Sequence, residues 1–315
     1  GGFLMSSGTP WNFDSDWIGY RISASGNLLW AKQYTAAGRQ VAPNIVASVA
    51  DTYFIYGWYN DSGGTSDDFG ILKIDGNGNQ LTAVALSFGG DDQMGGAIPD
   101  GAGGIIVSGE IEHNKTLIIM HLDANLTVLS ENQYQLPFWA SSQNIAQHPD
   151  GGYVVTMDRD PVDGESWQDF ILLKLDAAMN VQWVRSFYPT IGNILTEGKI
   201  RTILPLSDAI YLTGYWLLSG ADFTPCVMKF DNNGNHLWTK TTQNNQKGAF
   251  DLTYNAATPD APFILTGFLK NGPFGVNDRV VIRGTDVFDS CILTDMNLTV
   301  STETISPIGI SHTVT

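Results

Sequence analysis

Six copies of one short phrase recur along this 315-residue chain. In each copy an apolar run leads into a turn and then into a second run. The copies are DWIGYRISASGNLLW from Asp16, DFGILKIDGNGNQL from Asp68, TLIIMHLDANLTVL from Thr116, DFILLKLDAAMNVQW from Asp169, PCVMKFDNNGNHLW from Pro225 and SCILTDMNLTV from Ser290. Their turn positions are Gly26, Gly78, Leu126, Met179, Gly234 and Leu298, which gives steps of 48 to 64 residues. Because propeller blades repeat every ~40 to 50 residues, this period favours one repetitive domain over several unrelated ones.

Each copy is predicted to contain four β-strands, of which the third and fourth form a hairpin. The turns DGNGN at Asp75 and DNNGN at Asp231 suit a short hairpin, since Asp caps local amides and Gly supplies a positive φ. In DFILLKLD from Asp169, apolar side chains alternate onto both faces, so the sheet must be covered on both sides. Small four-stranded sheets stacked face to face meet that requirement.

The two ends of the sequence predict how the repeats close. The chain starts with GGFLMSSG, which has the pattern of a second strand, and ends with GISHTVT, which has the pattern of a first strand. The expected fold is therefore all-β, a six-bladed β-propeller of four-stranded antiparallel blades. Residues 1–315 form a single domain with an insertion at 268–287, and the ring is closed by pairing of the N-terminal and C-terminal strands. The alternative is a slice of a longer repeat array.

Charge and composition limit the partners. The chain has 32 acidic and 16 basic residues and a formal net charge of -16. Nucleic acid and anionic membrane surfaces are therefore unexpected partners, because binding to them needs Lys and Arg clusters. No apolar run of about 18 residues is present, so direct membrane insertion is not expected. The two cysteines, Cys226 and Cys291, are predicted to be buried free thiols, since facing sheets lie about 10 Å apart.

Four segments of the repeats resemble those of a known family. The segments are FGGDD at Phe88, PDGGYVV at Pro149, DFILLKLD at Asp169 and KFDNNGNHLW at Lys229. They resemble the propeller repeats of secreted and surface proteins of Bacteroidetes-type bacteria, many of which use the type IX secretion pathway. The resemblance implies an extracellular or cell-surface location. The sequence shows no charged segment followed by an apolar one at its start, so any signal peptide is expected to have been removed. It also implies a module of the kind found in adhesins, usually without a defined activity.

Known catalytic and metal-binding patterns fit the sequence poorly. The Asp75 and Asp231 turns begin like calcium loops, but Leu86 and Thr242 stand where a calcium loop needs a bidentate Glu. The five histidines lack metal-ligand spacing, and no GxSxG nucleophile elbow is present. His121 occupies the place of a Lys or Arg in other copies and is interpreted as a repeat variant. No cofactor is expected, and calcium is the one metal that the surface acids suggest, without support from their spacing.

Aromatic and acidic residues are predicted to collect in the loops at one face of the blades. Rings stack on sugar faces while acids and amides bond hydroxyls, so such a face suits a glycan. The alternative is that these aromatic side chains pack between blades or plug the ring. The candidate ligand-binding residues are Trp11, Trp58, Tyr59, Trp139, Trp167, Tyr215, Trp216, Asp91, Asp92, Asp158 and Asp160.

These patterns lead to two hypotheses about function. The first is a non-enzymatic extracellular or cell-surface propeller that binds or scaffolds a glycan or protein partner through its loop-rich face. The second is a carbohydrate-active enzyme, a glycoside hydrolase or lyase, with paired carboxylates in the central funnel. The second requires two acids such as Asp92 and Asp158 to stand about 5 to 9.5 Å apart in an open cleft.

Overall fold

The computed structural model describes most of the chain and divides it into two compact units. Unit 1 comprises Gly1–Leu136 and Ser306–Thr315, and unit 2 comprises Pro137–Ile305. All elements in the described part are β-strands, and none of it forms a helix that could span a membrane. The described residues are 2–8, 15–36, 38–60, 66–111, 115–159, 169–189, 197–217, 223–242, 247–257, 262–270, 277–285, 293–295, 298–303, 305–308 and 313–314.

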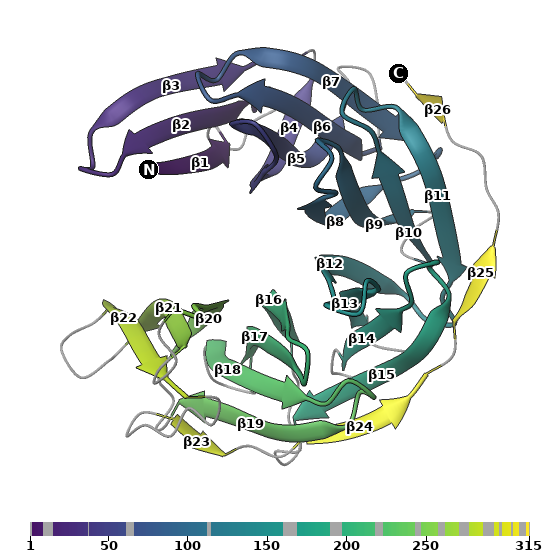
Figure 1. Ribbon diagram of the computed structural model, residues 1–315. Coiled ribbons are helices and arrows are strands. Elements are labelled where there is room, and N and C mark those ends of the chain that lie inside the picture. Colours follow the sequence, from purple (N-terminus) through teal and green to yellow (C-terminus); the bar gives the residue numbers. More distant parts are fainter. Residues whose placement is uncertain are drawn as a thin grey trace. The chain divides into compact units, whose positions relative to one another are not determined.

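Unit 1 contains three antiparallel sheets, blades 1 to 3, each lying next to the one that follows it in sequence (Figure 1). Blade 1 has the order β1–β2–β3, with β1 Gly2–Gly8, β2 Trp17–Ser23 and β3 Leu28–Tyr34. Blade 2 consists of β4 Arg39–Ala47, β5 Thr52–Asn60, β6 Asp68–Asp75 and β7 Gln80–Ser87, and β26 Thr313–Val314 is added beside β7. Blade 3 consists of β8 Gln93–Pro99, β9 Ile105–Ile111, β10 Thr116–Leu122 and β11 Val128–Gln135, and β25 Ser306–Ile308 is added beside β11.

Unit 2 contains blades 4 to 6. Blade 4 consists of β12 Ala140–Gln147, β13 Tyr153–Arg159, β14 Asp169–Leu175 and β15 Val181–Pro189, and β24 Leu298–Thr302 is added beside β15. Blade 5 consists of β16 Glu197–Pro205, β17 Ile210–Leu217, β18 Phe223–Phe230 and β19 His236–Thr242, and β23 Leu293–Asp295 is added beside β19. Blade 6 has the order β20–β21–β22, with β20 Lys247–Tyr254, β21 Phe263–Lys270 and β22 Asn277–Gly284.

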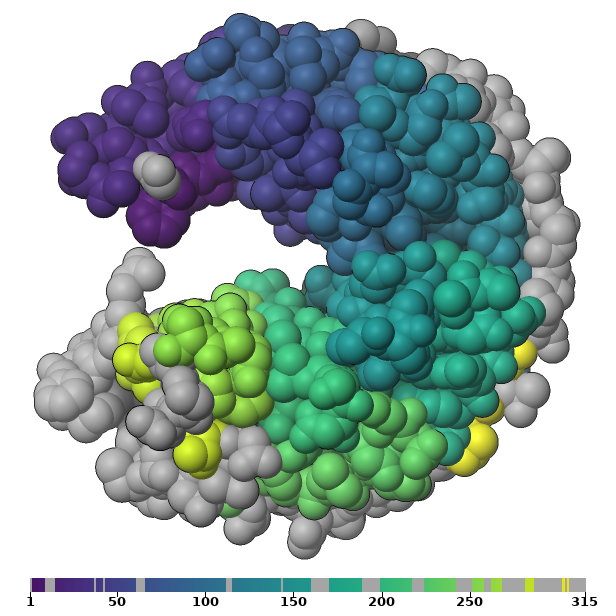
Figure 2. Space-filling model, in the orientation of Figure 1, coloured from purple at the N-terminus to yellow at the C-terminus, as the bar shows by residue number. Residues whose placement is uncertain are grey.

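Alternating apolar residues hold neighbouring blades together within each unit. On β6, Ile71 packs into the cluster that joins blades 2 and 3, whereas the next residue, Leu72, packs into the cluster that joins blades 1 and 2. On β18, Val227 and Met228 likewise contribute to different clusters. In Figure 2 the side chains of blades 1 and 2 pack directly against each other. The predicted fold class, an all-β chain of six propeller-type blades of antiparallel strands, is confirmed.

The hairpin turns form as predicted. In the turn at Asp231, the carboxylate accepts hydrogen bonds from the backbone N–H groups of Asn233 and Asn235, at 2.9 and 2.8 Å. Gly234 has a φ of 77°, in the left-handed region that favours glycine. The equivalent positions Leu126 and Met179 each have a φ of 65°, so the turn keeps its conformation where the repeat lacks glycine.

The last repeat differs from the prediction. The stretch 268–287, expected to be an insertion, contains β22, which pairs with β21 as the third strand of blade 6. The phrase that starts at Ser290, expected to supply a third and a fourth strand, supplies β23 and β24 instead. These strands pair with β19 and β15 of other blades. The segment VVIRG at residues 280–284 has the same alternating pattern as the phrase. The phrase alone therefore placed the third strand of the last blade too late in the sequence.

The predicted closure by the two terminal strands is wrong for the described residues. The C-terminal strand β26 pairs with β7, with Thr313 opposite Ser87 and Val314 opposite Leu86, while β1 pairs with β2 alone. Main-chain hydrogen bonds do not depend on side-chain identity, so any open strand edge can accept a terminal strand. The sequence identified a terminal strand but could not specify its acceptor.

Candidate functional site

The predicted binding residues are divided between the two units. Trp58, Tyr59, Asp91 and Asp92 belong to unit 1, while Trp139, Asp158, Tyr215 and Trp216 belong to unit 2. Trp11, Trp167 and Asp160 lie outside the described residues.

Several residues predicted in loops lie within second strands of their blades. Trp58 and Tyr59 are in β5, Asp158 is in β13, and Tyr215 and Trp216 are in β17. The second strands continue further than the turn-forming residues suggested, because aromatic residues also favour strands. A strand position directs a side chain toward a sheet face, so packing competes with ligand binding for these residues.

Trp216 is a packing residue. Its side chain is fully buried, and its ring lies 4.1 Å from the ring of Phe170 on the neighbouring blade of unit 2. The alternative of packing between blades is therefore confirmed at this position. Tyr215 is half-buried, and Trp139 is exposed over 49% of its surface.

Trp58 joins two blades of unit 1. It is half-buried against the apolar cluster between blades 2 and 3, and its Nε1–H donates to the carbonyl oxygen of Met94 at 3.2 Å. Removal of Trp58 would therefore disturb packing as well as any ligand contact.

The acidic residues of unit 1 organise a loop junction. The carboxylate of Asp92 is fully buried and accepts from the Phe88 N–H at 2.7 Å, and the Asp92 N–H donates to the carbonyl of Asp67 at 2.7 Å. Asp91 is exposed and accepts from the Asp67 N–H at 3.2 Å. Arg39 forms a salt bridge of 3.1 Å with Asp67. These contacts indicate that Asp67, Asp91 and Asp92 hold the loops in position.

Asp158, the second acid of the predicted carboxylate pair, is also buried in its own unit, with 4% of its surface exposed. A glycosidase acid or base must reach the substrate in a cleft. Asp92 and Asp158 therefore have the burial of structural carboxylates.

A cavity of about 380 Å³ lies between blades 1 and 2 of unit 1. Its volume is within the range of ~300 to 1,000 Å³ that is usual for small-molecule sites. Of the predicted residues, Tyr59 lines it. The lining residues are Trp17, Tyr34, Thr35, Ala36, Gln40, Tyr59, Gly70, Ile71, Leu72, Gln80, Ala83, Val84 and Ala85.

Small residues on blade 2 make room for the large rings. A Cβ on Gly70 would lie 2.9 Å from the ring of Trp17, so the close approach of blade 1 at this point requires glycine. On β7 the cavity is bordered by Ala83 and Ala85. Larger side chains at these two positions would occupy the space that forms the cavity.

The polar groups of the cavity are held in defined positions. The Tyr34 hydroxyl donates to the carbonyl of Gly78 at 3.0 Å. Burial, reinforced by the negative charge of Asp75, raises the pKa of Tyr34 to about 12, so its hydroxyl keeps its proton. The Gln40 amide fits an orientation in which its nitrogen donates to the carbonyl of Tyr34 at 2.9 Å.

Trp17 provides a hydrogen-bond donor without an acceptor. It is 4% exposed, and among the described residues no acceptor lies within hydrogen-bond reach of its Nε1–H. A buried donor left without a partner costs about 1 to 3 kcal/mol.

The chemistry of the cavity is that of a neutral site. Its described lining contains three aromatic side chains, two amides and one threonine hydroxyl, and no charged side chain. Such a lining favours a neutral ligand with an apolar face and several hydroxyl or carbonyl groups.

Sequence reasoning missed Trp17, Tyr34 and Gln40. Trp17 stands where two other copies of the phrase have Phe69 and Phe170, so the substitution of a larger ring was a visible signal. Gln40 lies in a first strand that the phrase does not include. Only the packing of blade 1 on blade 2 brings the three side chains together.

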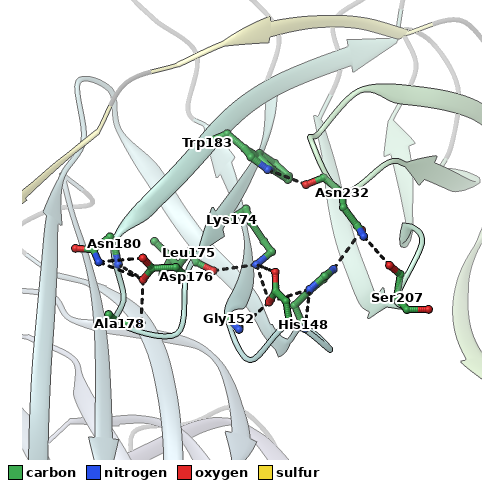
Figure 3. Close-up of polar contacts among 11 residues, drawn as sticks. His148, Gly152, Lys174, Leu175, Asp176, Ala178, Asn180, Trp183, Ser207 and Asn232 are labelled. Carbon is green, nitrogen blue, oxygen red and sulfur yellow. Dashed lines mark hydrogen bonds and ion pairs between the residues drawn. The ribbon is translucent and has the colours of Figure 1, made fainter.

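A second polar cluster, in unit 2, is structural (Figure 3). Lys174 is 1% exposed, and its ammonium donates to both carboxylate oxygens of Asp150, at 2.8 and 3.1 Å, and to the carbonyl of Leu175 at 3.0 Å. His148 bonds Asn232 of the neighbouring blade through Nε2 at 3.2 Å, and Trp183 Nε1–H donates to the carbonyl of Asn232 at 3.0 Å. Every member of the cluster bonds another member or the backbone.

His121, in blade 3, also bonds an acidic residue. His121 bonds Asp100 through Nε2 at 2.9 Å within blade 3, in keeping with its interpretation as a repeat variant. The described residues contain no group of three or more His, Cys, Asp or Glu side chains arranged to hold a metal ion.

The structure of the chain is similar to several solved structures. The chain is similar to an apocarotenoid oxygenase of Synechocystis, with a TM-score of 0.54 and 11% identity over 91% of this chain and 72% of that one. It is also similar to a periplasmic gluconolactonase of Pseudomonas aeruginosa, with a TM-score of 0.43 and 11% identity over 94% and 98% of the two chains. An exo-beta-1,3-galactanase of Phanerochaete chrysosporium gives 0.40 and 10% over 94% and 89%.

At these identities the similarity shows the fold alone. No protein-family model matches the sequence, and no curated protein matches it.

Proposed function

We propose that this chain is a non-enzymatic binding propeller that takes a neutral glycan in the cavity between blades 1 and 2. The observation that carries the proposal is the cavity lining, which joins the rings of Trp17, Tyr34 and Tyr59 to the amides of Gln40 and Gln80 without a charged group. Rings stack on the apolar faces of sugars, and amides bond sugar hydroxyls.

Hydrolysis at this cavity is disfavoured by the same lining. Glycoside hydrolases need two carboxyl groups about 5 to 9.5 Å apart around the scissile bond. The described lining supplies none. Binding without turnover is the activity that these side chains support.

An extracellular or cell-surface location belongs to this proposal. The net charge of -16 keeps the chain away from nucleic acids and anionic lipids, and its repeats resemble those of secreted and surface proteins. In this setting a propeller that binds sugars would serve adhesion or scaffolding, with a glycan as the partner at the cavity.

A glycan array with the purified chain, followed by calorimetry on the neutral glycans that bind, tests the proposal. Tyr59→Ala removes a ring, and Ala83→Leu fills the cavity without removing any contact. Because one stacked ring contributes about 0.5 to 1.5 kcal/mol, Tyr59→Ala is expected to weaken binding about 2- to 13-fold. Ala83→Leu is expected to weaken binding as well, because its side chain competes with the ligand for space. The matched control is Trp139→Ala, which removes an exposed tryptophan from unit 2.

Two outcomes would overturn the proposal. One is that no neutral glycan binds to the folded wild-type chain. The other is that affinity is unchanged in both cavity variants and falls in Trp139→Ala. Thermal unfolding of each variant distinguishes loss of the site from loss of the fold.

A further inference from the structure

The C-terminal strands follow a register that repeats every seven residues. Each one pairs antiparallel with the fourth strand of a blade, in the reverse of blade order. The paired residues are Leu293 with Thr242 of β19, Val300 with Phe187 of β15, Pro307 with Tyr134 of β11 and Val314 with Leu86 of β7. One step of seven residues in the segment therefore corresponds to one blade.

The four acceptor positions are equivalent in the repeat. One position in each third strand holds a basic residue or a histidine, and a residue of the fourth strand lies opposite it. The acceptor comes four residues after that opposite residue. In blade 2, for example, Thr82 lies opposite Lys73, and Leu86 is the acceptor. On β3 the residue that faces Arg21 is Trp30, so the equivalent acceptor is Tyr34. Blade 1 therefore carries the same acceptor edge as blades 2 to 5.

The edge of β3 is available in the described part of the chain. There β3 pairs with β2 alone, whereas β7, β11, β15 and β19 each have a second neighbour. An open strand edge presents backbone N–H and C=O groups that can pair with an extended segment. The acceptor strands β19, β15, β11 and β7 belong to blades 5, 4, 3 and 2, so the equivalent strand of blade 1, β3, is next in this order.

The strands β23, β24, β25 and β26 have similar sequences, which indicate what kind of segment could pair with the edge of β3. At the register position each carries an apolar residue, Leu293, Val300, Pro307 or Val314, and the neighbouring residues are mostly Ser and Thr. Among them β26 pairs over two residues only, whereas β24 pairs over five. With the fewest pairs in the described part of the chain, β26 is the segment that we take as the easiest to release and donate.

We propose that the edge of β3 around Tyr34 is an acceptor for an extended strand, and that its occupant is the C-terminal strand of a second copy of this chain. The added strand lies antiparallel to β3, with Val314 of the second copy opposite Tyr34. Backbone bonds provide the affinity, and the apolar residue at the register position provides the preference. The result is association between copies through strand addition, at the edge of the strand whose Tyr34 also lines the cavity.

A fluorescent peptide of residues 305–315 titrated onto the full-length chain tests this proposal. Saturable binding is expected, and a peptide with Val314→Asp is expected to bind at least tenfold more weakly. Proline removes a backbone donor, so Lys32→Pro and Gln33→Pro probe two successive N–H groups of β3. The variant whose N–H faces away from β2 is expected to keep its melting temperature and lose peptide binding at least tenfold.

Ser87→Pro on β7 is the matched control, because the peptide could instead replace the β26 strand of the same chain. Retained binding in Ser87→Pro together with loss in the β3 variant supports the proposal. Loss in Ser87→Pro with unchanged binding in both β3 variants would place the peptide on β7 and overturn it. Absence of binding to the wild-type chain would overturn it as well.

Discussion

Replacement of Asp150 by asparagine should destabilise unit 2 in a way that depends on pH. The Lys174 ammonium is nearly inaccessible to water and has the Asp150 carboxylate as its charged partner, at 2.8 Å. An asparagine side chain is close to isosteric with aspartate but neutral, so Asp150→Asn leaves a buried charge with weaker acceptors. Breaking the pair from the other side, by Lys174→Met, removes the buried charge and fills its space with an apolar chain.

The size of the effect follows from the pKa of Asp150. Partial burial acts to raise this pKa, but the bonds from Lys174, from the Gly152 N–H and from His148 outweigh it and lower the pKa from 3.8 to about 2. A shift of that size corresponds to at most about 2.4 kcal/mol, at 1.36 kcal/mol per pKa unit. Because 47% of the Asp150 side chain is exposed, water screens the interaction, and we expect about 1 to 2 kcal/mol.

The sign of the pH dependence follows from the direction of the shift. A carboxyl group whose pKa is lower in the folded state stabilises the fold when pH is above its unfolded pKa, here 3.8. That contribution is lost as pH falls toward about 2, and roughly half of it remains at pH 3. The difference in stability between wild type and Asp150→Asn should therefore be constant from pH 7 to pH 5 and shrink below pH 4.

Urea unfolding monitored by tryptophan fluorescence at pH 7, 5, 4 and 3 measures this difference. Asp208→Asn is the control, because Asp208 is an exposed acid of the same unit. The double variant Asp150→Asn with Lys174→Met should lose less stability than the sum of the single variants. A cost for Asp150→Asn that is no larger than that of Asp208→Asn, or that does not change between pH 7 and pH 3, would refute the reasoning.

Three further predictions concern packing and turns. Asp231→Ala removes the acceptor of two backbone bonds in a partly buried turn and should cost about 1 to 2 kcal/mol in chemical unfolding, whereas Asn233→Ser should cost much less. Burial raises the pKa of the Cys226 thiol, so in a Cys291→Ser background iodoacetamide should label it only after denaturation, and rapid labelling of the native chain would contradict this. Trp216→Ala should cost about 3 to 5 kcal/mol through the cavity it leaves, and Trp216→Phe clearly less, while neither alters glycan affinity if the variant remains folded.

Local features of the fold could be predicted from the sequence because their causes are local. The turn at Asp231 is fixed by an acid that bonds the N–H groups two and four residues ahead and by a glycine with positive φ. The strands of DFILLKLD and its equivalents follow from alternation on both faces. His121 was interpreted correctly as a repeat variant because its position in the strand is that of Lys73 and Lys174.

The role of individual aromatic residues could not be predicted in the same way. Trp216 and Tyr59 both stand near the ends of second strands, yet Trp216 is fully buried and Tyr59 lines a cavity. The difference depends on the residues that surround each ring. Phe170 of the neighbouring blade packs against Trp216, whereas the small residues Ala83 and Ala85 of the same blade border the cavity that Tyr59 lines.

The sequence by itself determined the blades, since the alternation of apolar residues and the chemistry of the turns act over a few neighbouring residues. Only the tertiary structure decided which strand edges the C-terminal segment occupies, because backbone hydrogen bonds accept any extended chain whatever its side chains. It also decided where rings gather around open space, because that depends on the volumes of residues on two different sheets. Five of the six phrases therefore specify the hairpins of blades 1 to 5, and the contacts between blades specify the cavity and the acceptor edge.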